Sequence, residues 1–291
     1  MFYPLLLSMR PRQWVKNAFV LPALLFSGHL FEWSYVQVSL GAVLCFCTLS
    51  SAVYLFNDLL DREQDRAHPR KSRRPIAAGL LSPRAAGSAA VLLGGAGIAG
   101  AFGLNPSFGG VALLYALLNL AYSLRLKRVV LIDVLIVASG FLLRALGGAV
   151  ALEVPISEWF ILCSFMLALF LAVVKRRQER VALEESAGGH RAILEEYSLP
   201  FLDQIISVVT AATLVCYALY AMGVGETKES GRPQMQWTIP FVLYGMLRYL
   251  YVVYRKGGGE SPTAVLWSDR PLQIDLLLWL AASFAGYYLL P

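Results

Sequence analysis

Long apolar stretches separated by short polar connections dominate the pattern of this 291-residue chain. A helix needs about 17–25 mostly apolar residues to cross the hydrocarbon core of a membrane. Stretches of about this length lie near residues 14–31, 36–59, 84–104, 107–124, 130–152, 157–175, 200–223, 236–254 and 271–290. No alternating strand pattern with turn residues accompanies them. The pattern predicts an all-α, polytopic membrane protein of about nine transmembrane helices, forming a single domain over residues 1–291.

The composition supports a membrane environment. Hydrophobic residues make up 57% of the chain and charged residues only 15%, whereas soluble domains carry about 25% charged residues. The four cysteines all fall within predicted spans, so the sequence indicates neither a disulfide framework nor a zinc site. No convincing cleavage site follows the first apolar stretch, so we expect no cleaved signal peptide.

Lysine and arginine gather in alternate connections between the predicted spans. Of the 25 basic residues, only Arg144, Lys228, Arg232 and Arg248 lie elsewhere. Because basic residues concentrate on the cytoplasmic side of membrane proteins, the pattern predicts a cytoplasmic N-terminus and an external C-terminus. Topology and contacts with anionic membrane lipids account for the net charge of +6. No basic groove interleaved with aromatic residues is visible, so nucleic acid is not an expected partner.

One of the basic connections also carries an acidic helix end. Asp58, Asp61 and Asp65 follow Asn57 at spacings that place Asp58 and Asp65 almost in register on a helix, with Asp61 about 60° away. Oxygen ligands of this kind suit Mg²⁺, which usually shares them with substrate phosphates. The segment therefore predicts a diphosphate-binding metal site facing the cytoplasm. The alternative is a solvated helix end whose acids neutralise neighbouring arginines.

Several cationic positions accompany the acids. Lys71, Arg73 and Arg74 follow His68-Pro69, where proline should end the helix. They are candidates for phosphate contact, although topology alone also explains basic residues there. Further candidates are Tyr122 and Lys127 at a later connection, Lys175, Arg176 and Glu179 at the end of the sixth span, Arg12 before the first span and Lys16 just inside it. Topology charge, a surface ion pair or contact with lipid headgroups would explain these residues equally well.

Three additional side chains carry less specific signals. Arg144 lies within a predicted span, where a charged residue usually faces a cavity or a partner, and it shares a helix face with Asp133, eleven residues earlier. His190 follows the basic run after the sixth span. We include them, with His68, as further candidates for the site.

The acidic segment resembles the first signature of the UbiA-type membrane prenyltransferase superfamily, which here takes the form Asn57-Asp58-x-x-Asp61-x-x-x-Asp65. Within that superfamily the chain is similar to a branch of phosphoribosyltransferases that act on polyprenyl phosphate. The matching pieces are Arg10-Pro-Arg-Gln-Trp-Val-Lys-Asn17, His68-Pro-Arg-Lys-Ser-Arg-Arg-Pro-Ile-Ala77, Tyr122-Ser123, Lys175-Arg-Arg-Gln-Glu179, Glu195-Glu-Tyr-Ser198 and Ser268-Asp-Arg-Pro271. The resemblance implies a UbiA-like helical bundle in a bacterial plasma membrane, with a cytosol-facing active site.

One departure from the superfamily pattern bears on the substrate. Typical members carry a second Asp-rich motif after the sixth span, where this chain has Lys175-Arg176-Arg177-x-Glu179. More fixed cations suit a more anionic pair of substrates. The resemblance thus implies transfer of 5-phosphoribosyl from phosphoribosyl diphosphate to a polyprenyl phosphate such as decaprenyl phosphate, yielding a precursor of cell-wall arabinan.

The resemblance also implies roles for the candidates. Asn57, Asp58, Asp61 and Asp65 would hold Mg²⁺; Arg12 and Lys16 would contact the lipid phosphate; the donor phosphates would meet Lys71, Arg73, Arg74, Tyr122, Lys127, Lys175, Arg176 and Glu179. The alternatives are an aromatic prenyltransferase of quinone or haem synthesis and, from another class, a cation-coupled transporter. Because ionisable residues cluster at one membrane boundary rather than at the midplane, the transporter is disfavoured. The sequence leaves open a homo-oligomer.

Overall fold

The structure, a computed structural model, describes residues 2–68, 71–185, 192–194, 196–224, 235–255 and 262–289. Helices account for the regular structure of these residues, and no strand occurs among them. The chain forms two compact units, residues 1–155 and 156–291.

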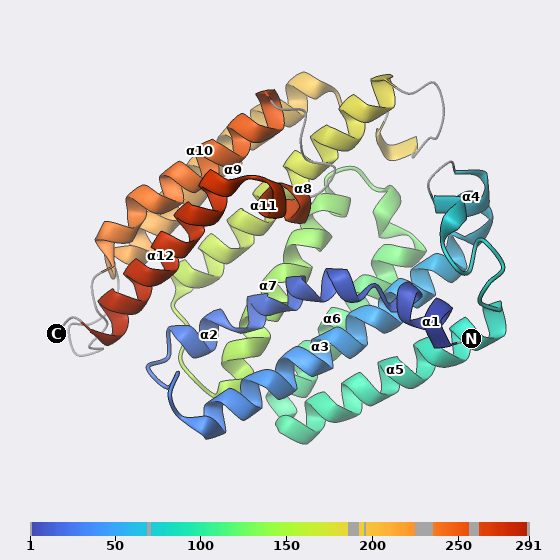
Figure 1. Cartoon of the computed structure of the whole chain (residues 1–291), viewed down its shortest axis with the longest axis horizontal. Helices are drawn as coiled ribbons and strands as arrows, with labels where there is room; N and C mark the ends of the chain where they lie inside the picture. The colour runs from blue at the N-terminus through green and yellow to red at the C-terminus, as the bar shows by residue number, and fades with distance from the viewer. Residues whose placement is uncertain are drawn as a thin grey trace. The chain divides into compact units, whose positions relative to one another are not determined.

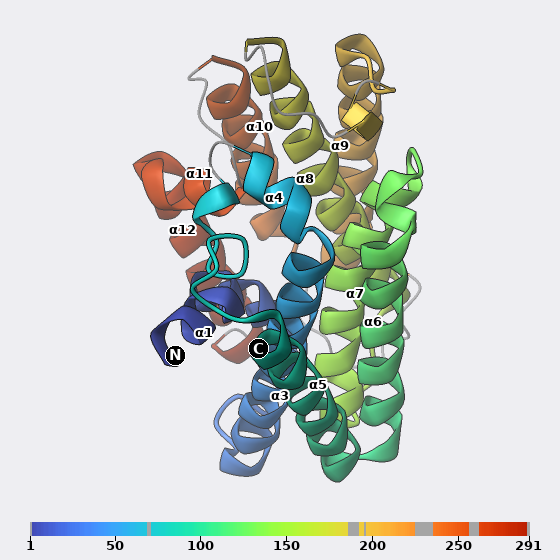
Figure 2. The same cartoon turned by 90° about the vertical axis from the view of Figure 1, so that its right-hand side faces the viewer.

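The first unit is built around a long helix that carries the acidic segment at its end. In chain order its elements are α1 (Phe2–Met9), the 3₁₀ helix η1 (Pro11–Val20), α2 (Pro22–Leu25), α3 (Trp33–Leu60), α4 (Arg62–Ala67), η2 (Lys71–Arg73), α5 (Pro83–Leu104), α6 (Pro106–Leu124), η3 (Leu126–Arg128) and α7 (Ile132–Leu152). Helix α5 packs along α3, α6 packs along α5, and α7 packs along α6 (Figures 1 and 2).

Aromatic rings fill the centre of this unit. Phe46 of α3 meets Phe108 and Tyr115 of α6 edge to face, with ring centroids 5.8 and 5.2 Å apart. Offset and edge-on geometry is the favourable one for such pairs. Next to them, η1 lies directly against the backbone of α7: a Cβ on Gly148 would fall 2.1 Å from the carbonyl oxygen of Val20. Only glycine permits this approach, which seats η1 in the unit.

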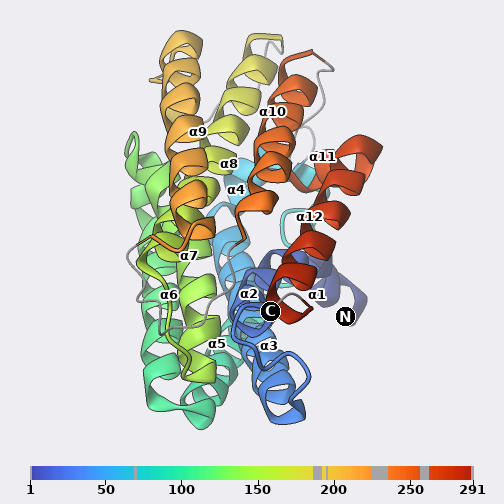
Figure 3. The same ribbon diagram turned by 90° about the vertical axis from the view of Figure 1, so that its left-hand side faces the viewer.

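The second unit consists of two helix pairs. Its elements are α8 (Glu158–Glu185), η4 (Ala192–Leu194), α9 (Leu199–Ala221), η6 (Gln236–Thr238), α10 (Ile239–Arg255), α11 (Pro262–Ser268) and α12 (Arg270–Tyr288). Helix α9 packs mainly on α8, and α10 packs mainly on α12 (Figure 3). Tyr217 of α9 joins the pairs at one end, because its hydroxyl bonds Thr238 Oγ1 at 2.6 Å and accepts from Trp279 Nε1 at 2.7 Å.

Helix starts follow local sequence signals. Ser82, Asn105 and Asp269 each precede a helix with proline in its first turn, and their side chains accept bonds from backbone N–H groups three residues later, at 3.3, 2.7 and 3.1 Å. A capping side chain followed by proline satisfies N–H groups that have no partner within the helix.

The predicted spans coincide with helices in eight of the nine ranges, with the first range as the exception. There the chain forms η1 and then the four-residue α2, which begins at Pro22. Six of the described helices, α3 and α5 to α9, are long and apolar enough to cross a membrane. The protein is therefore a multi-pass, all-helical membrane protein, while the count of nine spans stays a prediction.

Candidate active site

The acidic segment stays close to helical across the junction of α3 and α4. Helix α3 ends at Leu60, Asp61 is the residue between the two helices, and α4 begins at Arg62. The backbone N–H of Asp61 still bonds Asn57 O at 3.0 Å, and that of Asp65 bonds Asp61 O at 2.8 Å. The spacing predicted from the sequence is thus kept. Helix α4 then ends at Ala67, with His68 extended before Pro69, as predicted.

One arginine joins the two carboxylates that lie in register. Arg74 Nη1 donates to Asp58 Oδ1 at 2.9 Å and to Asp65 Oδ2 at 2.6 Å. Asp58 also accepts from Arg10 Nη2 at 2.5 Å. Both aspartates are only 3% exposed, and buried charges of one sign need such compensation.

The third carboxylate has its own cation. Asp61 Oδ1 accepts from Lys127 Nζ at 2.5 Å, and Asp61 Oδ2 accepts from Asn57 Nδ2 at 3.1 Å. Lys127 also donates to Asn57 Oδ1 at 3.4 Å. The tip of η3 is thereby tied to the end of α3, sixty-six residues apart in sequence. We call Arg10, Asp58, Asp61, Asp65, Arg74 and Lys127 the carboxylate–cation cluster.

Arg10 is a member of this cluster that the candidate residues of the sequence analysis did not include. It has a left-handed backbone conformation (φ 55°, ψ 60°) between α1 and η1, which is uncommon for a residue other than glycine. Its guanidinium lies over the ring of Tyr54 at 4.9 Å. The sequence signal was present, because Arg10 opens one of the segments that match the superfamily, but sequence spacing could not show that it reaches Asp58.

The other candidates of the first unit differ in exposure. Lys71 and His68 are half-buried, and the backbone N–H of Lys71 bonds His68 Nδ1 at 3.3 Å. Arg73 is exposed in η2, and Tyr122 is half-buried in the last turn of α6. On η1, Arg12 is exposed and Lys16 half-buried.

Arg144 sits in a buried polar network inside the first unit. It is 6% exposed, and it donates to Asn17 Oδ1 at 2.8 Å, to Gly140 O at 2.9 Å and to the hydroxyl of Tyr115 at 2.7 Å. Its partners are thus an amide, a carbonyl and a phenol, and it forms no salt bridge with an acid of the described residues. Asp133 is fully buried in the first turn of α7, where the helix dipole favours a negative charge.

The candidates after the sixth span belong to the second unit, on the last turns of α8. Arg176 Nη1 donates to Glu179 Oε2 at 2.6 Å, and Lys175 Nζ lies 3.6 Å from Glu179 Oε1. Arg176 is 6% exposed, whereas Lys175 is exposed. The structure therefore brings these three together. His190 lies outside the described residues.

The donor set of the cluster fits a hard divalent cation. All the candidate ligands are carboxylate or amide oxygens, the kind that Mg²⁺ binds at about 2.1 Å. Asp58 Oδ1 and Asp65 Oδ2 already share one positive atom, Arg74 Nη1, at 2.9 and 2.6 Å. Among the described residues no group of three acidic, histidine or cysteine side chains is gathered as a metal cage. The carboxylates hold side-chain cations instead.

The fold and the site together define a class of protein: helical, multi-pass membrane proteins with an acidic helix end that is paired to basic side chains. The chain belongs to the UbiA prenyltransferase family, whose model matches residues 17–269. That match extends over both units.

Curated relatives cover nearly the whole chain. Decaprenyl-phosphate phosphoribosyltransferase of Mycolicibacterium smegmatis is 36% identical over 98% of this chain and 92% of that protein. The protein of the same name from Corynebacterium glutamicum is 36% identical over 98% of this chain and 86% of its own length.

Solved structures share the fold. A UbiA homolog from Archaeoglobus fulgidus bound to GPP and Mg²⁺ has a TM-score of 0.73, covering 97% of this chain and 99% of that one at 20% identity. A UbiA homolog from Aeropyrum pernix has a TM-score of 0.58 at 17% identity, covering 92% and 94%. Together with the helices described above, these likenesses confirm the predicted UbiA-like fold.

Proposed function

We propose that the chain transfers 5-phosphoribosyl from phosphoribosyl diphosphate to a polyprenyl phosphate, such as decaprenyl phosphate, and releases diphosphate. The observation that carries the proposal is the carboxylate–cation cluster, in which three aspartates are matched by three basic side chains. The names of the relatives give the acceptor, decaprenyl phosphate, and the transferred group, phosphoribosyl; the donor diphosphate follows from the resemblance described in the sequence analysis. Both units together would form one transferase domain, with the cluster on the cytoplasmic side and the C-terminus outside.

The pairing within the cluster supports an exchange of cations on substrate binding. A Mg²⁺ that arrives with the donor diphosphate would be held by Asp58, Asp61, Asp65 and Asn57, and it would supply charge neutralisation for the leaving group. Asp58 and Asp65 already share one positive atom, Arg74 Nη1, at 2.9 and 2.6 Å, so their oxygens would suit a shared divalent cation in its place. The displaced cations, Arg74 among them, would then be free to bind the diphosphate.

The remaining basic side chains would clamp the rest of the donor. Lys71, Arg73 and Tyr122 of the first unit are candidates for phosphate oxygens, as are Lys175 and Arg176 of the second, where Glu179 holds their side chains. Arginine binds phosphate oxygens through paired N–H groups, so it gives orientation as well as charge. Arg12 and Lys16 would meet the phosphate of the lipid.

The chemistry asks little of the protein beyond positioning and charge. The bond between C1 of the ribose and the diphosphate oxygen breaks, and a bond forms between C1 and an oxygen of the lipid phosphate, with inversion at C1. The lipid phosphate is already ionised at neutral pH, so no general base is required. The fixed cations stabilise the negative charge that grows on the leaving diphosphate.

The test uses purified full-length protein, phosphoribosyl diphosphate labelled in the ribose, polyprenyl phosphate and Mg²⁺. We expect a labelled lipid and an equal amount of diphosphate. Asp65→Ala should lower turnover by at least about 100-fold, the loss expected for one charge-stabilising group. Glu63→Ala is the matched control, since Glu63 lies on the same helix with a 75% exposed side chain, and it should stay within about twofold.

Three outcomes would overturn the proposal. Turnover of Asp65→Ala within about threefold of wild type would remove the metal-binding role from the cluster, since one lost ligand should cost far more. Incorporation of a prenyl group into an aromatic acceptor, without any labelled lipid from the ribose donor, would favour an aromatic prenyltransferase. Uptake of label without a labelled lipid would favour a transporter.

A further inference from the structure

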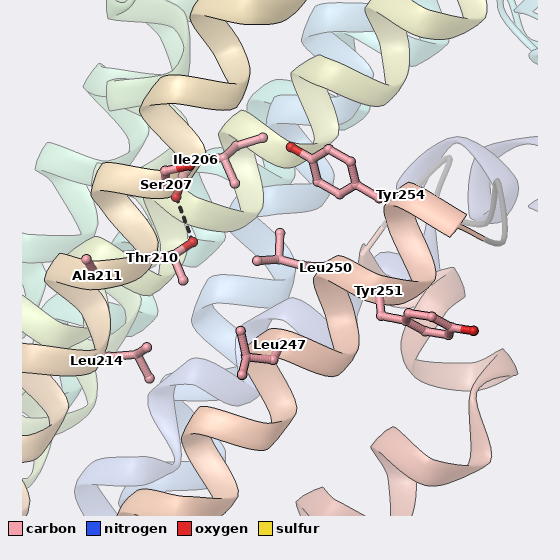
Figure 4. A pocket seen from close by; sticks show the side chains of 9 residues that line it. All are labelled: Ile206, Ser207, Thr210, Ala211, Leu214, Leu247, Leu250, Tyr251 and Tyr254. Atoms are coloured by element: carbon pink, nitrogen blue, oxygen red, sulfur yellow. Dashed lines mark hydrogen bonds between the residues drawn. The ribbon is translucent and has the colours of Figure 1, made fainter.

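A groove lies between the two helix pairs of the second unit. Its volume is about 600 Å³, within the usual range for sites that hold one small ligand or chain. Figure 4 shows Ile206 and Thr210 of α9 on one wall and Leu247 and Leu250 of α10 on the other. Helix α9 packs mainly on α8 and α10 mainly on α12, and the direct contact between α9 and α10 is smaller, so the groove opens along their facing surfaces.

The walls of this α9–α10 groove offer hydrocarbon rather than hydrogen bonds. The two hydroxyl side chains on the α9 wall bond their own helix: Ser207 Oγ donates to Asp203 O at 3.0 Å, and Thr210 Oγ1 donates to Ile206 O at 2.6 Å. On the open side, Leu247 is 53% exposed and Tyr251 is 50% exposed. Helix α9 is long and apolar enough to cross a membrane, so this apolar wall belongs to a candidate membrane-spanning helix.

Polar contacts close both ends of the groove. At the end near Tyr217, the bonds to Thr238 and Trp279 join the helices. At the other end, Tyr254 and Arg177 both donate to Asp203 Oδ1 at 2.5 Å, and the guanidinium of Arg177 lies 4.0 Å above the Tyr254 ring. The apolar stretch between them runs from Ile206 to Leu214, about 12 Å of helix.

The end at Tyr254 is the one suited to a lipid headgroup. Arg255 ends α10 with its side chain exposed, and it lies four residues after Tyr251, hence on the same face as the groove. Tyrosine and arginine at this level are typical of the membrane interface, where the ring is half in the lipid and the cation meets headgroups. Among the described residues, Arg177 and Arg255 at this end stand against the carboxylate of Asp203.

We propose that the α9–α10 groove binds an anionic glycerophospholipid of the surrounding membrane, with one acyl chain between the helices and its phosphate at Arg255 and Arg177. The apolar walls select a hydrocarbon chain, and the excess of positive charge at one end selects a negative headgroup. The bound lipid fills the space between the two helix pairs. The inference does not depend on the transfer reaction.

The test measures lipid retention by the purified full-length chain. Native mass spectrometry after exchange into equal amounts of phosphatidylglycerol and phosphatidylcholine should show phosphatidylglycerol retained. Phosphatidylglycerol with a photoreactive acyl chain should label peptides containing residues 206–214 and 247–254. Arg255→Gln should lower the preference for phosphatidylglycerol by about fivefold, the value of one basic residue at an anionic lipid surface.

Two variants of α9 make the test specific. Ala211→Trp would fill the groove from an exposed lining position and should lower labelling there by at least about tenfold, the loss of about two buried CH₂ groups. Val208→Trp is the matched control, because Val208 is 65% exposed and does not line the groove, and it should change labelling by no more than about twofold.

Three results would overturn the proposal. Even labelling over the exposed faces of α9 and α10, unchanged by Ala211→Trp, would show only ordinary bilayer contact. Displacement of the photoreactive lipid by an equal concentration of polyprenyl phosphate would assign the groove to the isoprenoid tail. Loss of labelling together with cross-links between two copies of the chain would assign it to an interface between protomers.

Discussion

Arg74 binds the two most buried carboxylates of the cluster, those of Asp58 and Asp65, and its positive charge offsets their mutual repulsion. Removing Arg74 should therefore lower the stability of the protein. Asp58 keeps Arg10 at 2.5 Å, whereas Asp65 keeps no other basic partner among the described residues. Breaking a buried ion pair by deleting one partner costs about 3–5 kcal/mol. Because Asp58 remains paired, we expect Arg74→Met to lose about 3 kcal/mol. At about 2–4 °C per kcal/mol, the unfolding temperature should fall by about 6–12 °C in chelator.

Magnesium should act differently on the variant and on the wild type. A ligand that binds only the folded protein adds about 2.7 kcal/mol of stability at a hundred times its dissociation constant. In the wild type Arg74 occupies carboxylate oxygens that the metal would bind, whereas in Arg74→Met the carboxylate of Asp65 has no other basic partner among the described residues. The shift in unfolding temperature on adding Mg²⁺ should therefore be larger for the variant, although its transfer activity should be lower.

The assay is thermal unfolding of the detergent-purified protein, followed by intrinsic fluorescence with chelator and across a Mg²⁺ series. Arg73→Met is the matched control, because Arg73 is the neighbouring residue and is exposed, so its stability should change by no more than about 0.5 kcal/mol. Equal Mg²⁺ shifts for Arg74→Met and wild type would refute the idea that arginine and metal compete for the same oxygens.

Further predictions concern the first unit. Gly148→Ala should prevent folding or lower expression sharply, because the new Cβ would lie 2.1 Å from Val20 O. The control Gly95→Ala, where a Cβ would meet open space, should change the free energy of unfolding by no more than about 1 kcal/mol. Thermal unfolding of the two variants compares them. Arg144→Lys should lose about 1–3 kcal/mol because lysine lacks the planar fork that reaches Asn17 and a second acceptor together; a wild-type unfolding temperature would contradict this role. Chelation should abolish labelled-lipid formation and Mg²⁺ should restore it, so full activity in excess chelator would contradict metal dependence.

The periodic features of the chain were predictable from the sequence because local geometry sets them. Apolar stretches of helical length correspond to helices, and the helical repeat places Asp58 and Asp65 close enough to share Arg74. The stop at His68-Pro69 follows from the steric effect of proline on the residue before it. These predictions need only the residues within one or two turns.

Pairing between distant segments was not predictable in the same way. Many basic residues follow the acids in sequence, and only the fold shows that Arg74, Arg10 and Lys127 are the ones in contact. Arg144 shares a helix face with Asp133, but eleven residues of helix span about 16 Å, so a common face does not mean contact. Likewise, the apolar stretch at 14–31 gave no sign that its first part would be a 3₁₀ helix.

All six members of the carboxylate–cation cluster come from residues 10 to 127, inside the first unit. The charge arrangement of the cluster is thus contained in one unit, so a chimera that keeps residues 1–155 and takes the remainder from a relative keeps the residues of every one of these pairs. Exchanging the remainder would accordingly reveal what Lys175, Arg176 and Glu179 of the second unit add to donor binding, while the acidic helix end stays unchanged.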